Sequence, residues 1–305
     1  MKIRILITLL VVLLSVSVYF NIKPDDNTWF VSFQNANTRP TYDTFHSIKK
    51  AQQSITGKGI KVGIIGKYFG YADNKNMYAG GKNFTDNKAS FEDIAEHGLW
   101  MATTLKEIAP DVEIYALCAR DNNRAKEAEN IAKAIDWAIE NNIDILTYSG
   151  EAFRKEDRVV IDEAVHKAIN NNIVTTFIHY DLPENILPTG LFPKSPESYA
   201  REPDVNIFHF DYNLLLIFVY ENFVKSGRKV GNNIGALPYF SNSSMSPVLA
   251  GIVAMMKERN NDLPPEKYKK ILIETSKEIE YNGYNVRHVV DAFDATNVLL
   301  KNEGE

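Results

Sequence analysis

Short apolar runs alternate along this chain with stretches that carry apolar residues at helical spacing. The apolar runs read as strands, and they cover Ile60 to Ile65, Val112 to Ala119, Ile143 to Ser149, Ile173 to Tyr180 and Val205 to Phe210. Between two of them, Ile131, Ile135 and Ile139 recur on one face of a predicted helix from Ala125 to Asn142. This alternation is typical of a parallel sheet covered by helices on both faces. We therefore predict an α/β fold with a mainly parallel central sheet.

Length and composition fit one large domain rather than several small ones. The chain has 305 residues, of which 45% are hydrophobic and 24% charged, so it has enough apolar material for a substantial core. Its formal charge of -5, without a dense Lys/Arg stripe, argues against a nucleic-acid partner. Cys118 is the only cysteine, which rules out an internal disulfide, and its apolar surroundings predict a buried, inert thiol. No Cys/His cluster suggests a metal site.

A serine-rich turn leads into an almost wholly apolar helix predicted from Ser244 to Met256. The stretch Tyr239 to Gly251 reads Tyr-Phe-Ser-Asn-Ser-Ser-Met-Ser-Pro-Val-Leu-Ala-Gly. On its own it is compatible with the start of an ordinary buried helix, in which Ser or Asn caps the end and Pro occupies the first turn. This segment is also compatible with a turn that presents a nucleophilic serine, although on its own it favours the ordinary helix. A further amphipathic helix is predicted from Leu263 through Ser276.

The order and spacing of several other segments are informative. They are the strand-like Gly57 to Gly66, a loop at Gly80 to Asn87, the helix start Glu96-His-Gly-Leu-Trp-Met-Ala102, the segments Ile108 to Ala116 and Ala134 to Leu146, and a closing Tyr284 to Ala295. Together with the serine turn, their order and spacing resemble the subtilisin-like serine proteases, the subtilases, over roughly residues 55 to 300. The resemblance implies a doubly wound, three-layer fold and a serine endopeptidase ancestry.

The resemblance also assigns the catalytic positions. The family's serine pattern, Gly-Thr-Ser-x-Ala-x-Pro-x-x-Ala-Gly, aligns on Pro247, Ala250 and Gly251 and puts the nucleophile at Ser243. His97 matches the general base. The family's acid, an aspartate at the end of the first strand, is replaced by Gly66, which has no side chain to orient an imidazole. The sequence leaves open whether another carboxylate, such as Asp73, Asp93 or Glu96, takes that place.

Two further family positions are altered. Asp181 stands where the family has the asparagine that donates to the oxyanion, and a carboxylate there would repel the developing charge. His179 either donates a hydrogen bond at that oxyanion site or is an ordinary strand histidine with a satisfied ring. The substrate strand reads Ser149-Gly150-Glu151 in place of Ser-Leu-Gly. Because peptide binding at such an edge depends mainly on main-chain hydrogen bonds, binding is expected to tolerate this change.

The N-terminus is predicted to direct export. Lys2 and Arg4 precede a mostly apolar run at residues 5–20, and the chain then turns polar. We divide the chain into a signal peptide or membrane anchor with its polar flank at 1–26, a tether and approach segment at 27–54, and a subtilase-like domain at 55–305. Cleavage and retention of the apolar run both remain open. The tether is too short for the prodomain that family proteases commonly carry. The expected location is extracellular or in the cell envelope.

Two functions of different classes follow from these residues. The favoured one is a pseudoprotease that keeps the fold to bind a peptide or protein partner. The alternative is an active serine endopeptidase that uses Ser243 and His97 with a non-standard third group. A third reading, an unrelated doubly wound binding domain, is weak because the glycines at 57, 59, 63 and 66 form no dinucleotide-binding motif. We expect no cofactor. Calcium binding stays open, because no calcium-binding loop of the family is matched, and Asp86, Asp93 and Asp111 read as solvated loop carboxylates rather than ligands.

Overall fold

The computed structural model describes residues 43–120, 126–150, 153–178, 180, 182–186, 188–191, 215–218, 222–230, 233–239, 242–281 and 284–301. The chain separates into two units, residues 1–39 and 40–305, and all of these ranges belong to the second. The apolar run at 5–20 and the predicted strand Val205 to Phe210 lie outside the described residues. Within the described ranges, no helix is both long and apolar enough to cross a membrane.

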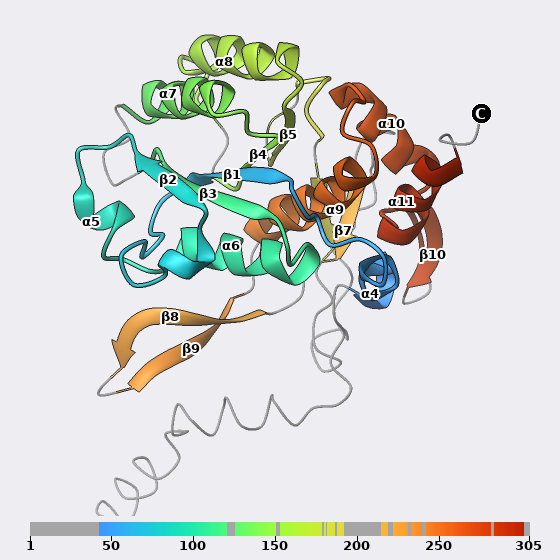
Figure 1. Cartoon of the computed structure of the whole chain (residues 1–305), viewed down its shortest axis with the longest axis horizontal. Helices are drawn as coiled ribbons and strands as arrows, with labels where there is room; N and C mark the ends of the chain where they lie inside the picture. Colours follow the sequence, from blue (N-terminus) through green and yellow to red (C-terminus); the bar gives the residue numbers. More distant parts are fainter. Residues whose placement is uncertain are drawn as a thin grey trace, which may run out of the picture. The chain divides into compact units, whose positions relative to one another are not determined.

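A five-stranded parallel sheet forms the centre of this unit (Figure 1). Its order is β2-β3-β1-β4-β5, with β1 at Lys61–Gly66, β2 at Gly80–Asn83, β3 at Glu113–Cys118, β4 at Ile145–Tyr148 and β5 at Val174–Phe177. The strands predicted near residues 60, 112, 143 and 173 are therefore confirmed. The prediction of a loop at Gly80 was wrong for its first four residues. Their sequence has no strand pattern, and they become a strand by pairing with β3.

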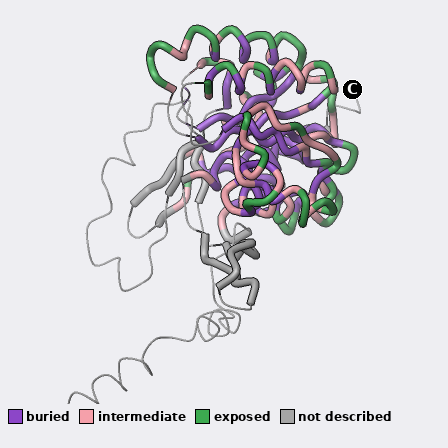
Figure 2. Tube along the Cα trace, turned by 90° about the vertical axis from the view of Figure 1, so that its left-hand side faces the viewer, coloured by how far each residue is buried: buried purple, intermediate pink, exposed green. Residues whose placement is uncertain are grey.

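Two helices cover each face of the sheet. Helices α6 (His97–Ile108) and α9 (Met245–Arg259) lie on one face, and α7 (Glu127–Glu140) and α8 (Arg158–Asn170) lie on the other (Figure 1). Successive side chains of a strand point to opposite faces, so Val62 and Ile64 of β1 join the α6/α9 core and Ile65 joins the α7/α8 core. Figure 2 shows the buried sheet between helices whose outer sides are exposed. The predicted three-layer α/β architecture is confirmed.

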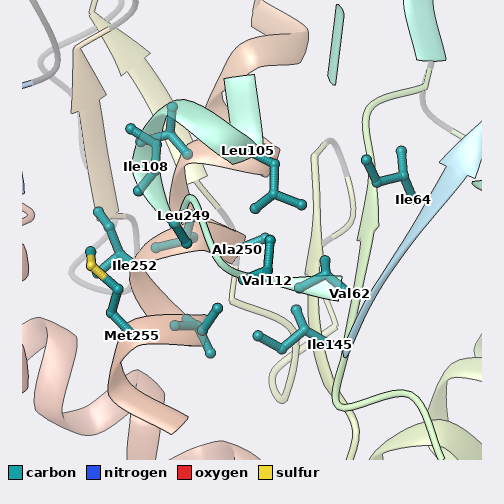
Figure 3. Close-up of a cluster of buried hydrophobic side chains, with 14 of the residues drawn as sticks. Val62, Ile64, Leu105, Ile108, Val112, Ile145, Leu249, Ala250, Ile252 and Met255 are labelled. Atoms are coloured by element: carbon teal, nitrogen blue, oxygen red, sulfur yellow. The ribbon is translucent and has the colours of Figure 1, made fainter. Parts of the chain in front are cut away.

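Helices α6 and α9 pack closely because α9 carries small residues where it meets α6. Leu105 and Ile108 of α6 meet Leu249, Ala250 and Ile252 of α9 in one buried cluster (Figure 3). A Cβ added at Gly251 would lie 2.7 Å from both the Cβ and the Cγ2 of Ile108, closer than side chains approach one another. Gly251 thus sets the distance between the two helices, and almost every residue of α9 is buried.

The remaining elements surround this core. Strands β10 (Lys277–Tyr281) and β11 (Tyr284–Val289) join β7 (Leu215–Phe218) and β6 (Pro188–Leu191) in a second sheet of order β10-β11-β7-β6. Strands β8 (Asn222–Val230) and β9 (Asn233–Tyr239) form an antiparallel pair. The other segments are α3 (Asp43–His46), α4 (Ile48–Gln52), η1 (Lys75–Met77), α5 (Lys88–Phe91), η4 (Asn242–Ser244), α10 (Pro265–Glu274) and α11 (Ala292–Lys301). The helix predicted from Leu263 corresponds to α10, and the predicted serine helix corresponds to η4 and α9.

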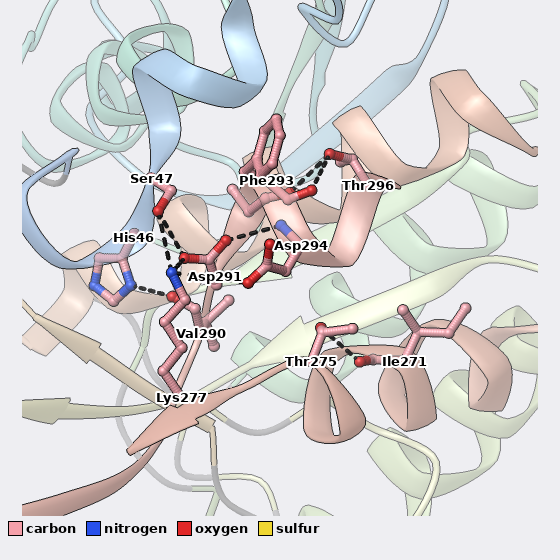
Figure 4. A network of polar contacts seen from close by, with 11 residues as sticks. His46, Ser47, Ile271, Thr275, Lys277, Val290, Asp291, Phe293, Asp294 and Thr296 are labelled. Carbon is pink, nitrogen blue, oxygen red and sulfur yellow. Dashed lines mark hydrogen bonds and ion pairs between the residues drawn. The ribbon is translucent and has the colours of Figure 1, made fainter. Parts of the chain in front are cut away.

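A buried polar network joins the start of the described domain to its end (Figure 4). Nδ1 of His46 donates to the carbonyl oxygen of Val290 at 2.7 Å. The carboxylate of Asp291, which is 1% exposed, accepts from Ser47 Oγ at 2.6 Å and pairs with Lys277. Burial lowers the pKa of His46 to about 4, so its imidazole is neutral at physiological pH. The segment around α3 is therefore fastened to the C-terminal part of the domain.

We expect Gly251→Ala to destabilise the domain by about 1–3 kcal/mol, because the new methyl group overpacks Ile108 between α6 and α9. Gly66→Ala in β1 is the matched control, since among the described residues an added Cβ there meets only the Phe69 ring, at 3.6 Å. Urea unfolding of the full chain measures both. Equal losses in the two variants would contradict the close α6–α9 approach.

We also expect His46 to make the domain acid-sensitive. Its pKa is about 4 when folded and about 6.5 when unfolded, so protons bind preferentially to the unfolded chain as pH falls through this window. Stability should therefore decline from pH 6.5 towards pH 4, by roughly 2 kcal/mol for this group. This pH-dependent loss of stability should be smaller in His46→Gln than in the wild type. In His166→Gln it should equal the loss in the wild type, because His166 is exposed on α8. Urea unfolding at pH 7 and pH 4.5 tests this, and identical declines in all three proteins would contradict it.

Candidate active site

The carboxyl ends of β1, β3 and β4 meet at one edge of the sheet, where parallel α/β proteins bind ligands. The backbone N–H groups of Ala119 and Arg120, which follow β3, donate to the carbonyl oxygen of Gly66 at 3.1 and 3.2 Å. Ser149 follows β4 directly. These bonds bring the predicted positions Gly66 and Ser149 to the same edge and add Arg120 to them.

His97 is held beside Gly66 by the backbone. It is the first residue of α6, and the N–H of Gly98 donates to the carbonyl oxygen of Lys67 at 2.8 Å. The carbonyl oxygen of Tyr68 accepts from Glu96 N–H at 2.9 Å, and Tyr68 adopts the left-handed conformation with φ of 64°. The turn after β1 is thus bonded directly to the start of the histidine helix.

Gly66 leaves room on the face of the sheet where His97 lies. By the alternation of β1, a side chain at residue 66 would point to the same face as Val62 and Ile64, which is the α6 face. Among the described residues, the one atom within 4 Å of an added Cβ is the ring Cζ of Phe69, at 3.6 Å. Gly66 is therefore not required by crowding, unlike Gly98, where an added Cβ would lie 2.6 Å from the Phe69 ring.

The electrostatic surroundings of His97 oppose a positive charge on its ring. The residue is half-buried, but its Nδ1 atom is shut off from solvent. Burial lowers the pKa of His97 to about 4, and the positive charges of Arg120 and Lys67 add to this effect in that order. At neutral pH the imidazole is uncharged, and gaining a proton costs more here than in water.

The two cations differ in how they are held. Nε of Arg120 pairs with Glu127 Oε1 of α7 at 2.6 Å, and the guanidinium lies 5.7 Å from the centre of the Tyr148 ring. Nζ of Lys67 lies 4.7 Å from the centre of the Tyr68 ring. Within the described part of the chain, Lys67 forms no ion pair with a carboxylate, whereas Arg120 does.

Ser243 lies in η4, immediately before α9, and η4 contacts α6. Its side chain is half-buried, and its Oγ donates to the carbonyl oxygen of Ser149 at 3.3 Å. Ser149 Oγ donates in return to the carbonyl oxygen of Ser243 at 2.7 Å. This reciprocal pair ties the predicted nucleophile to the predicted substrate strand and joins both to the edge where His97 lies.

The first turn of α9 is bonded to the sheet through Ser246. Its hydroxyl lies 2.7 Å from Thr147 Oγ1 of β4 and donates to the carbonyl oxygen of Thr176 in β5. Thr176 Oγ1 donates to the carbonyl oxygen of Ser246 at 3.3 Å. All three side chains are buried, so these bonds fix the helix that begins next to Ser243.

An aromatic cluster underlies the segment after β4. Tyr148 stacks on Phe153 with ring centroids 5.1 Å apart, and Tyr180 meets Phe153 edge-on at 5.6 Å. A Cβ at Gly150 would lie 2.0 Å from the Tyr148 hydroxyl, so residue 150 has to be glycine in this arrangement. No local sequence pattern predicted this cluster, because its three aromatic residues come from separate segments of the chain.

The structure describes only some of the other predicted site residues. His179 and Asp181 lie outside the described residues, so the predicted oxyanion region stays a prediction. Of the open substitutes for the acid, Asp73 and Asp93 are exposed and Glu96 directly precedes α6. Cys118 is buried, as predicted. Among the described residues, no three His, Cys, Asp or Glu side chains gather as they would around a metal ion.

Comparisons with known proteins agree with this architecture. No protein-family model matches the chain. It is 27% identical over 165 residues to the minor extracellular protease Epr of Bacillus subtilis, a match that covers 51% of this chain and 24% of Epr. It is 26% identical over 129 residues to subtilisin E of the same organism, covering 38% and 34%. An intracellular serine protease of Paenibacillus polymyxa is 26% identical over 259 residues, covering 74% and 78%.

Solved structures share the fold at low identity. MycP1 without its N-terminal propeptide has a TM-score of 0.63 at 16% identity, covering 85% of this chain and 98% of MycP1. Fervidolysin from Fervidobacterium pennivorans, an enzyme related to subtilisin, has a TM-score of 0.63 at 15% identity, covering 84% and 45%. The chain spans about a quarter to a third of the length of Epr and subtilisin E. In sequence the chain is therefore similar to subtilisins and related serine proteases, and in fold it is similar to subtilisin-like proteases.

Proposed function

We propose that this protein is a pseudoprotease, a subtilase-like domain that binds a peptide or protein partner without hydrolysing it. One observation carries the proposal: the surroundings of His97 combine the side-chain-free Gly66 with the cations Lys67 and Arg120. In a serine protease the histidine takes the proton of the serine and becomes positively charged in the transition state. An acid stabilises that charge, whereas the two cations raise its energy.

The expected loss of rate is large. Replacing the acid of a Ser-His-Asp triad by a residue without its charge lowers turnover by about 10⁴. Lys67 and Arg120 raise the free-energy cost of protonating His97, because like charges disfavour the protonated imidazole. This cost comes in addition to the loss of the acid's charge. If Asp181 also stands at the oxyanion position, as the sequence predicts, the loss of a donor there costs about 10² to 10³ more. Such factors are not additive, but each acts against catalysis.

The bonding of Ser243 supports the same conclusion. Its hydroxyl donates to the carbonyl oxygen of Ser149, so this acceptor competes with His97 for the serine proton. A carbonyl oxygen is far too weak a base to remove that proton. Ser243 in this arrangement stabilises the joint between η4 and the end of β4.

Binding depends on different groups from catalysis. An extended peptide pairs with a strand through unpaired main-chain groups. Strand β4 is paired with β1 on one side and with β5 on the other, so we expect the peptide to pair with the segment Ser149–Gly150, which follows β4 at the carboxyl end of the sheet, where Ser243 lies. This segment is held by the Ser243 bonds and by the packing of Gly150 on Tyr148. We therefore place the peptide along residues 149–150. The partner is a peptide or protein in an extended conformation.

We further propose that the domain acts outside the cytoplasm. The support is the apolar run at residues 5–20 behind Lys2 and Arg4, which has the pattern of a signal peptide or membrane anchor. Similarity to a minor extracellular protease and to secreted subtilisins agrees with export. Retention of the run would hold the domain at the outer surface of the membrane.

Labelling with a fluorophosphonate probe tests the absence of catalysis. The full chain is expected to label no faster than Ser243→Ala or His97→Ala, because the serine is not activated by a base that an acid supports. An active subtilisin in the same reaction is the positive control, and circular dichroism confirms that all variants are folded. Labelling that requires both residues would establish the alternative, an active serine endopeptidase with a non-standard third group.

Gly66→Asp should restore part of the missing chemistry. The space at residue 66 faces α6, so an aspartate there adds a negative charge beside His97 and raises the pKa of this histidine. We expect fluorophosphonate labelling of Ser243 to accelerate at least about tenfold over the wild type. Gly66→Asn is the matched control, since it has the same shape without the charge. Equal labelling of the Asp and Asn variants would contradict the assignment of Gly66 to the acid position.

A further inference from the structure

We infer that residues 47–58 form a clasp that positions the predicted catalytic segments from the far ends of their helices. The clasp joins the C-terminal ends of α6 and α9, whereas His97 begins α6 and Ser243 lies in η4, directly before α9. Gln52 and Glu258 are its positioning residues. Such a clasp serves a binding site and a catalytic site alike, so it goes beyond the proposed function.

Gln52 of α4 closes the C-terminal end of α6. The last four carbonyl groups of an α-helix have no partner within the helix. Nε2 of Gln52 donates to two of them in α6, Glu107 O at 2.8 Å and Ile108 O at 2.9 Å. A side chain from the N-terminal segment therefore supplies a cap for the helix that begins at His97.

Glu258, in the last turn of α9, is held by three backbone donors of the clasp. Its Oε2 accepts from the N–H groups of Thr56 at 2.8 Å, Gly57 at 2.5 Å and Lys58 at 3.0 Å. Bonds from backbone N–H groups to a carboxylate are among the stronger hydrogen bonds in proteins. The same short segment is therefore bonded to α6 through an amide and to α9 through a carboxylate.

Gly57 is wedged between the ends of the two helices. A Cβ added at residue 57 would lie 2.5 Å from Val112 Cγ1, 3.0 Å from Ala109 Cβ and 3.5 Å from Ala254 Cβ. Ala109 directly follows α6, and Ala254 belongs to α9. Gly57 has a φ of 81°, in the left-handed region that glycine adopts readily. Glycine is thus required here by space and by conformation, and the clasp contacts both helix ends at once.

Buried contacts fasten the clasp along its length. At its start, Ser47 Oγ donates to the buried carboxylate of Asp291 (Figure 4). Three of its apolar side chains lie in the same core cluster as the α6–α9 contact, namely Ile48, Ala51 and Ile55. The clasp is therefore an integral part of the packed domain, although the sequence analysis assigned residues 47–54 to the approach segment.

Helices α6 and α9 transmit this constraint to the site. Helix α6 has 12 residues and is therefore about 18 Å long, and an α-helix of this length behaves as a rigid element. A shift at the clasped end changes the separation of the segments that carry His97 and Ser243. A cut in the chain before β1, or a pull on it, would act at the same point.

Hydrogen exchange of the full chain, followed by mass spectrometry, tests the clasp in Gln52→Met and Glu258→Ala. Each variant removes one attachment and leaves the residues of the site unchanged. Exchange in residues 97–104, at the start of α6, should accelerate about tenfold over the wild type, because hydrogen bonds that favour the closed arrangement are lost. Exchange in α8, on the other face of the sheet, should change by less than about twofold.

Two control variants separate this effect from a general loss of stability. Gln53→Met makes the same substitution at the exposed neighbour of Gln52 and should exchange like the wild type. Ile161→Val removes a buried methyl group from the α7/α8 core and should accelerate exchange in α8 at least as much as in residues 97–104. Circular dichroism confirms that all variants are folded.

Three outcomes in Gln52→Met or Glu258→Ala would overturn the inference. The first is exchange that does not change in residues 97–104. The second is an acceleration confined to residues 105–112, which would make the attachment a local cap of the helix end. The third is an equal acceleration in residues 97–104 and in α8, which would make the attachment a general contributor to stability and not a positioning device.

Discussion

The buried hydrogen bonds of Ser246 fix the geometry on which the rest of the site depends. Its hydroxyl joins Thr147 of β4 and Thr176 of β5, so the first turn of α9 is fastened to two neighbouring strands at their carboxyl ends. Gly251, one turn further along, lets the same helix approach α6 closely. Because α6 begins at His97 and η4, which contains Ser243, leads directly into α9, this packing brings the two predicted catalytic segments together. The architecture of a protease site is therefore held by buried contacts that do not depend on catalysis.

The electrostatics of the site oppose catalysis, although its architecture resembles that of a protease site. A catalytic histidine needs an environment that tolerates a positive charge, and such an environment is usually supplied by a buried carboxylate. Here burial lowers the pKa of His97, and Arg120 and Lys67 lower it further. A single negative charge at residue 66 would give the protonated His97 ring an attractive interaction where its nearest charges now repel it. The fold thus brings the predicted catalytic positions together, and in our proposal the charges around the His97 ring decide whether the site is chemically active.

Much of the fold could be predicted from the sequence. Strands β1, β3, β4 and β5 are short apolar runs, and such runs are typical of strands that are buried on both faces of a sheet. Strand β2 was not, since Gly80–Asn83 has no strand pattern and depends on its pairing with β3. The positions of Gly66, His97, Ser149 and Ser243 followed from motif spacing. The influence of Arg120 on His97 did not, because it arises only when the ends of β1 and β3 are bonded side by side. The aromatic cluster of Tyr148, Phe153 and Tyr180 likewise joins residues that no local pattern connects.

The most direct test of the central claim is the pKa of His97 itself, measured by NMR titration of the wild-type full chain in a buffer free of carboxylates. The structure predicts a value well below the ordinary 6.5 of histidine, near 4, because burial and two cations oppose protonation. A value at or above 6.5 would show that a carboxylate already supports the ring. That result would contradict the proposal that no acid supports His97 and would favour an active endopeptidase.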